Sequence, residues 1–177
     1  MANKRQQLED QVLVMDAQDG DAEAMRKLVL RWQKPLWHHA YRLTGHEDAA
    51  WDVMQEAWHD MIKGLHKLHD PASFRAWAYK ITTNKAMNWI KKKSRHQHVP
   101  LEVVYDNPAR IESDTGLQEL MGQLNAAKRV VLSLYYFEQL SVSEISFALR
   151  IPPGTVKSRL HAAREELKSL WLRQNNE

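Results

Sequence analysis

The C-terminal part of the chain encodes two helices joined by a tight turn. Ser141 is followed three residues later by Glu144, a spacing typical of a capping box at the start of a helix. This helix should end near Leu149, because residues 151–154 contain two prolines and a glycine. A second helix should begin near Thr155, since the apolar residues that follow recur with a helical period. These residues are Val156, Leu160, Ala163, Leu167 and Leu170.

The start of this second helix carries side chains suited to nucleic acid. Lys157, Ser158 and His161 project away from the apolar stripe, as in the first turns of a recognition helix that enters the major groove. Arg159 lies nearer the stripe, where it would reach a flanking phosphate. The pattern predicts a helix-turn-helix, and the alternative is a plain helical hairpin with a basic face.

Helices are predicted in the rest of the chain as well. The 177 residues include only six glycines and six prolines, and alternating Val, Ile and Thr runs do not occur. Residues 96–115 lack a helical apolar period and have no pattern that would fix their neighbours relative to each other. We therefore predict an all-α fold, with two small helical domains at residues 1–95 and 116–177 joined by a flexible linker at residues 96–115.

The first domain should contain four helices. They are expected at about residues 8–17, 22–44, 46–63 and 74–93. Asp21 is placed to cap the second helix, Pro35 should kink or break it, and Gly45 should end it. Residues 64–73 are expected to form a loop, with Ser73 as the cap of the fourth helix.

The third predicted helix has an apolar and an acidic face. The apolar face would consist of Ala50, Val53, Met54, Ala57, Trp58 and Met61. Asp52, Gln55, Glu56 and His59 gather on the opposite side, within a segment, residues 47–60, that has five acids and no Lys or Arg. Such a face suggests a basic protein partner, and the alternative is a solvated surface.

The fourth predicted helix is basic. Between Asp70 and Glu102 there is no acid, and the seven cations are Arg75, Lys80, Lys85, Lys91, Lys92, Lys93 and Arg95. By the helical period, Lys80, Asn84, Asn88 and Lys91 share one stripe about 80° wide. Two amides flanked by lysines suit nucleic acid, although an ordinary polar face would look similar. Trp89 is a candidate for base stacking, whereas Trp32, Trp51, Trp58 and Trp77 are expected in or beside the core.

Three segments, in this order, resemble sigma factors of the extracytoplasmic-function class within the sigma-70 family. The first combines residues 41–45 with residues 52–58. The second combines residues 73–81 with Asn84 and Asn88. The third combines residues 140–145 with residues 153–160 and with Ala163 and Arg164.

This resemblance implies an N-terminal region 2 and a C-terminal region 4. Region 2 would bind the β′ coiled coil of core RNA polymerase through Asp52, Gln55 and Glu56. It would also open and read the −10 element of promoter DNA, and the loop at residues 64–73 would hold a flipped base. Region 4 would read the −35 element and contact the β flap. Many members of the family are held inactive by an anti-sigma factor, so such a partner is possible here.

The predicted promoter-contacting residues fall into two sets. Those for the −10 element are Lys80, Asn84, Asn88, Trp89 and Lys91. Those for the −35 element are Thr155, Lys157, Ser158, Arg159, His161 and Arg164. The chain departs from the family pattern at His161-Ala162, where larger or basic residues are frequent, and at Arg150, where Gly, Asn or Asp is usual.

Several classes of function are not supported. The chain has no cysteine, and its nine histidines do not combine with carboxylates at a recognisable metal spacing. Nucleophile–base motifs and phosphate-binding glycine loops do not occur, so we expect no enzyme, cofactor or metal. We expect no membrane insertion and a cytoplasmic location. The alternatives to a sigma factor are a stand-alone regulator that uses the helix-turn-helix, and a helical scaffold that binds RNA.

Overall fold

A computed structural model describes residues 4–97 and 115–175, and within these ranges the chain is helical with no strand. The predicted all-α fold is therefore confirmed. The first block, residues 4–97, contains α1 (Lys4–Gln18), α2 (Ala22–Thr44), α3 (Glu47–Gly64) and α4 (Phe74–Gln97). The second block, residues 115–175, contains α5 (Thr115–Gln123), α6 (Ala126–Leu132), the π-helical turn η3 (Ser133–Phe137), α7 (Val142–Leu149) and α8 (Pro153–Asn175). The predicted linker lies outside the described residues, except at its two ends.

Local interactions explain where α2 begins and ends. The Asp21 side chain accepts hydrogen bonds from the N–H groups of Glu23 and Ala24. Gly45 adopts φ 74° and its N–H donates to the Tyr41 carbonyl at 2.8 Å, which closes the helix. The alternative of a break at Pro35 is wrong, because α2 continues through it to Thr44. Buried residues on both sides of Pro35 hold the helix across the missing hydrogen bond. These are Leu28, Trp32, Leu36 and Ala40.

The segment between α3 and α4 is more ordered than a plain loop. It contains two short 3₁₀ turns, η1 (Leu65–Lys67) and η2 (Pro71–Ser73). Asp70 caps η2 by accepting the Ala72 N–H, and the Ser73 hydroxyl donates to the Asp70 carboxylate at 2.7 Å. Ser73 thus supports the capping residue instead of capping α4 itself.

The helix-turn-helix expected in the second block is present. Ser141 and Glu144 form the predicted capping box of α7. Arg150 ends α7 in the left-handed region with φ 54°, so it takes the conformation that Gly or Asn usually supplies. Helix α8 begins at Pro153, two residues before the predicted Thr155, because proline suits the first helical turn.

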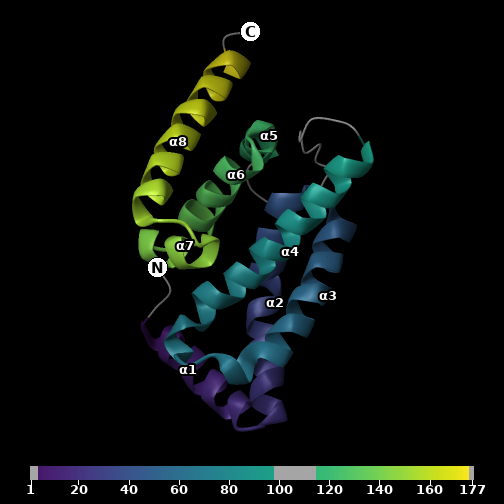
Figure 1. The fold of residues 1–177 in the computed structure, drawn as a ribbon, viewed down its shortest axis with the longest axis vertical. Helices are drawn as coiled ribbons and strands as arrows, with labels where there is room; N and C mark the ends of the chain where they lie inside the picture. Colours follow the sequence, from purple (N-terminus) through teal and green to yellow (C-terminus); the bar gives the residue numbers. More distant parts are fainter. Residues whose placement is uncertain (1–3, 98–114, 176–177) are drawn as a thin grey trace.

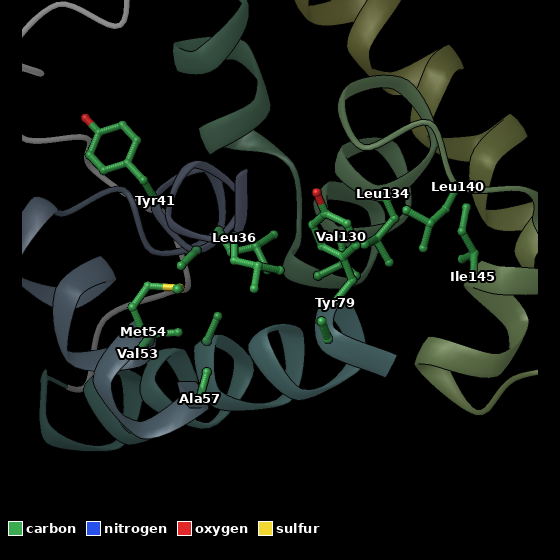
Figure 2. Packing of buried hydrophobic residues seen from close by; sticks show 14 of the residues in the cluster. Leu36, Tyr41, Val53, Met54, Ala57, Tyr79, Val130, Leu134, Leu140 and Ile145 are labelled. Atoms are coloured by element: carbon green, nitrogen blue, oxygen red, sulfur yellow. The ribbon is translucent and has the colours of Figure 1, made fainter. Parts of the chain in front are cut away.

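The two blocks pack directly against each other. Helix α7 lies against α4 (Figure 1), and α6 and η3 contact α2. Figure 2 shows one continuous apolar core, in which Leu36 and Tyr79 of the first block meet Val130 and Leu134 of the second. Contacts between helices therefore fix the blocks relative to each other, which no pattern in residues 96–115 indicates.

Most of the predicted core is confirmed. The apolar stripes predicted for α3 and α8 face inward, and Trp32 is buried. Trp58 and Trp77 are half-buried beside the core. Trp51 is an exception, because it is 46% exposed and its ring lies 5.6 Å from that of Trp37 at the surface.

Candidate nucleic-acid interface

Helix α3 presents the predicted acidic face to solvent. Asp52, Gln55 and Glu56 are exposed, while Val53 and Met54 between them are buried. The buried residues fix the rotation of the helix about its axis. The three polar side chains are therefore held on one outward-facing surface.

One end of this acidic face is tied to the basic helix. The Lys85 ammonium of α4 lies 2.8 Å from Asp60 and 3.4 Å from Glu56. Its hydrogen bond to Asp60 raises the pKa of Lys85 and lowers the pKa of Asp60. Glu56 is therefore partly neutralised from within the molecule, a feature that the sequence did not indicate.

A groove of about 700 Å³ runs between α3 and α4. It brings together residues that the sequence analysis placed in two different sites, because the acidic set lines one wall and Asn88 and Trp89 line the other. Its full lining is Asp52, Val53, Gln55, Glu56, Lys85, Asn88, Trp89, Lys92 and Lys93.

The predicted −10 residues on α4 are in different environments. Asn84, Asn88 and Lys91 are exposed along one side of the helix. Lys80 is half-buried, with its ammonium 4.3 Å from the centre of the Phe147 ring in α7. Burial, followed by the charge of Arg150, lowers the pKa of Lys80. The second block thus covers one end of the predicted stripe.

Trp89 is half-buried between two neighbours. The Lys93 ammonium lies 5.0 Å from the centre of its ring, and the His46 ring is 5.7 Å away. These contacts hold the indole at the edge of the groove between α3 and α4. A base that stacks on Trp89 would have to use the part of the ring that these neighbours leave accessible.

Helix α8 presents the predicted −35 residues in two groups. Lys157, Ser158, His161 and Arg164 are exposed, and Thr155 and Arg159 are half-buried. The Ser158 hydroxyl donates to the Thr155 carbonyl at 3.1 Å, which leaves its oxygen available as an acceptor. Arg164 lies farther along the helix and reaches the Tyr136 hydroxyl at 3.4 Å.

Sequence reasoning missed a buried polar cluster between the two blocks, which we call the Glu138 cluster. Its members are His39, Arg42, Arg75, Tyr79 and Glu138. The Glu138 carboxylate accepts hydrogen bonds from the Arg42 guanidinium and the Tyr79 hydroxyl, each at 2.5 Å. Arg75 donates to the Glu138 carbonyl. All four partners come from the first block, and Glu138 comes from the second.

His39 is completely buried at the edge of this cluster. Its Nδ1 lies 3.1 Å from the Ser133 hydroxyl and 3.7 Å from Glu138, and its Nε2 lies 2.8 Å from the Thr83 hydroxyl. Burial and the nearby Arg42 charge lower the pKa of His39 to about 3. Burial raises the pKa of Glu138, while the Arg42 charge opposes that rise. His39 is thus a neutral hydrogen-bonding bridge, and Glu138 is the group that pairs with Arg42.

Two other features bear on the classes of function considered above. In the part of the chain that the structure describes, no three His, Cys, Asp or Glu side chains come together as a metal site. Among the helices at residues 4–97 and 115–175, none is long and apolar enough to span a membrane.

Comparison with known families accounts for both blocks. Residues 28–96 match the family model for sigma-70 region 2, and residues 115–167 match that for sigma-70 region 4. Helix α3 and the stripe on α4 lie in the first match, and the helix-turn-helix lies in the second.

Similar proteins are known along nearly the whole chain. The ECF RNA polymerase sigma factor SigE of Mycolicibacterium smegmatis is 30% identical over 178 residues, covering 93% of this chain and 68% of that protein. SigW of Bacillus subtilis is 27% identical over 173 residues, covering 88% and 92%. The ECF sigma-E factor of Escherichia coli is 29% identical over 181 residues, covering 92% and 94%.

Two solved structures share the fold. The sigma factor RpoE of Bartonella quintana, in complex with the anti-sigma factor NepR, aligns with a TM-score of 0.74 at 22% identity, covering 85% of this chain and 98% of that one. CnrH in complex with the cytosolic domain of CnrY aligns with a TM-score of 0.70 at 22% identity, covering 92% and 97%.

Proposed function

This chain belongs to the extracytoplasmic-function class of RNA polymerase sigma factors. On that basis we propose which of its surfaces contact core polymerase, the −10 element and the −35 element. As a sigma factor it binds core RNA polymerase and directs the enzyme to promoters. The stand-alone regulator and the RNA scaffold are set aside, because both blocks match sigma-factor regions.

The acidic face of α3 is the proposed docking surface for core polymerase. The observation that carries this assignment is that Asp52, Gln55 and Glu56 are all exposed on one rigid face whose opposite side is core. Opposite charges across an interface steer association and select the partner. A basic or amphipathic helix, such as the β′ coiled coil implied by the family, suits this face.

The exposed stripe on α4 is the proposed −10 surface. Asn84 and Asn88 offer amide donors and acceptors, and Lys91 offers a charge for phosphate. Because Asn88 also lines the groove beside the acidic face, polymerase docking and −10 recognition would be adjacent events. Trp89 lines the same groove.

The start of α8 is the proposed −35 surface. Lys157, Ser158 and His161 are exposed at the N-terminal end of this helix, where a recognition helix contacts base edges. Arg159 and Arg164 are assigned to phosphate. We propose a non-catalytic protein that acts in the cytoplasm with core polymerase and promoter DNA, and that an anti-sigma factor holds in check. The two solved relatives above, which were captured with such partners, support the last point.

Charge reversal tests the docking surface. The double variant Asp52→Lys, Glu56→Lys should weaken binding to core polymerase at least about a hundredfold, since like charges across an interface cost several kcal/mol. The fold should survive, because both residues are exposed and the Glu56–Lys85 pair at the surface contributes at most about 1 kcal/mol.

The matched control reverses two acids elsewhere in the first block. Asp16→Lys, Asp19→Lys makes the same change in net charge at exposed positions in and after α1. Binding can be measured by fluorescence titration of labelled protein with core enzyme, with circular dichroism as the check on folding. If the α3 variant binds as tightly as the control, the acidic face is not the docking surface.

A further inference from the structure

The Glu138 cluster joins the two blocks at one charged residue. Glu138 is 7% exposed, and its carboxylate meets Arg42 of α2 and Tyr79 of α4. Two cation–ring contacts cross the same boundary, Arg42 over Phe137 at 4.4 Å and Lys80 over Phe147 at 4.3 Å. The contact between the blocks is therefore held by charge as well as by apolar packing.

The backbone around Glu138 is distorted in a way that aims this carboxylate inward. Residue Glu138 follows the π-helical turn η3, and its N–H bonds to the Ser133 carbonyl at 3.1 Å. The next residue, Gln139, has φ 54°, an unfavourable conformation for a residue with a side chain. Such distortions are often found at functional positions. Here they turn the chain so that Glu138 points into the first block while Leu140 packs in the core.

The closed arrangement is incompatible with reading both promoter elements at once. Helix α7 of the helix-turn-helix lies against α4, which carries the proposed −10 residues, and it covers Lys80. Elements at −10 and −35 are separated by about 25 base pairs, or roughly 85 Å of duplex. Two blocks packed against each other in one small protein cannot place their reading surfaces that far apart.

We propose that the Glu138 cluster is an autoinhibitory latch, which holds the second block closed on the first in the free protein and must open before both blocks engage polymerase and promoter. This inference rests on the proposed assignment of the two reading surfaces. Interfaces between domains of one chain are commonly polar and reversible, as a latch requires. Breaking the ion pair removes the Glu138 carboxylate from the part-buried Arg42, so the closed state is selectively destabilised.

The apparent affinity for core polymerase should then depend on the fraction of the protein that is open. A partner that engages only the open form binds with a dissociation constant divided by the open fraction. A variant that raises the open fraction should lower the apparent Kd for core polymerase by the same factor, until the open form predominates.

The experiment uses the full chain with two engineered labels. The natural chain has no cysteine, so His66→Cys and Arg173→Cys, both at exposed positions, would carry the only thiols. Energy transfer between dyes at these sites reports closure, and titration with core polymerase reports the apparent Kd. Glu138→Gln removes the charge and keeps the size. We expect the open fraction to rise at least tenfold and the apparent Kd to fall in proportion.

A control and a second variant keep the outcome interpretable. Glu166→Gln breaks the Lys128–Glu166 pair, which is part-buried but lies within the second block, and should change neither readout. Tyr79→Phe removes only the hydroxyl that donates to Glu138 and should shift both readouts in the same direction as Glu138→Gln, by less.

Three results would contradict the proposal that the Glu138 cluster is a latch. They are an open wild type by energy transfer, closure that survives both Glu138→Gln and Tyr79→Phe, and opening without the matching change in apparent Kd. If the wild type does not bind core polymerase at all, the proposed function fails instead. Energy transfer then still decides whether Glu138 closes the protein.

Discussion

Protonation of His39 should destabilise the folded protein below neutral pH. The ring is completely buried, its two nitrogens contact hydroxyl groups, and Arg42 lies nearby. These conditions lower the pKa of His39 from 6.5 to about 3 in the folded state. Above pH 6.5 both states are neutral and the group contributes nothing. As the pH falls from 6.5 towards 3, the unfolded chain binds a proton that the folded chain does not, so stability is lost.

The size of the effect follows from the two pKa values. Each pH unit within that window costs about 1.4 kcal/mol, so the free energy of unfolding should fall by about 2 kcal/mol between pH 7 and pH 5 through this group alone. The titration of Glu138 changes the free energy of unfolding in the opposite direction, because burial raises the pKa of this carboxyl group. The quantity to measure is therefore the difference between the wild type and His39→Gln, since both proteins contain Glu138.

Urea unfolding followed by circular dichroism at a series of pH values gives this difference. His39→Gln keeps an amide that can bond to Ser133 and Thr83, and it should lose stability at pH 7 but show the shallower pH dependence. His38→Gln, which replaces a half-buried ring whose pKa is also lowered, should show a smaller change. Parallel pH profiles for the wild type and His39→Gln would refute the burial of a neutral His39.

Two further outcomes test the second block. Replacing both Lys157 and Ser158 by alanine should relax the −35 sequence preference and cost about 1–3 kcal/mol of specific binding, whereas Arg159→Ala should weaken binding to all sequences alike. Selection from a randomised promoter library with each holoenzyme measures these preferences. Unchanged preferences in the Lys157 and Ser158 variant would contradict the assignment of these residues to base reading. Arg150→Gly should stabilise the protein by about 0.5–1 kcal/mol. The left-handed conformation at φ 54° costs a residue with a side chain roughly 1–2 kcal/mol, and glycine recovers part of that cost. A urea unfolding midpoint below that of the wild type would contradict this prediction.

Much of the fold could be predicted because the signals are local. The capping box at Ser141, the glycine stop at Gly45 and the apolar stripe of α3 each depend on residues a few positions apart, and the structure confirms all three. The predicted end of α4, near residue 93, is four residues too early. Helix α4 continues to Gln97 because Ser94, Arg95 and His96 do not break a helix, and the first proline in that region is Pro100.

The contact between the blocks could not be predicted in the same way, although one signal was present. Val130, Leu134 and Glu138 are spaced four residues apart, so a carboxylate lies in line with two core residues. His39 likewise continues the stripe of Trp32 and Leu36. A charged residue on a core stripe requires a buried partner. The partner of Glu138 is about a hundred residues away in the sequence, so pattern alone could not identify it as Arg42.

The chemistry of this contact suits a closure that a large partner can reverse. An ion pair taken out of water regains little net free energy, because the loss of hydration offsets most of the attraction. Since the two blocks belong to one chain, their high effective concentration allows a weak contact to remain closed. A partner that engages both blocks loses only this small net amount when it separates them, and it returns Glu138 and Arg42 to water. If the same positions were apolar, closure would be stronger and opening more costly, and the exposed faces would tend to aggregate. A buried charge at the centre of the contact therefore specifies one closed arrangement without making it permanent.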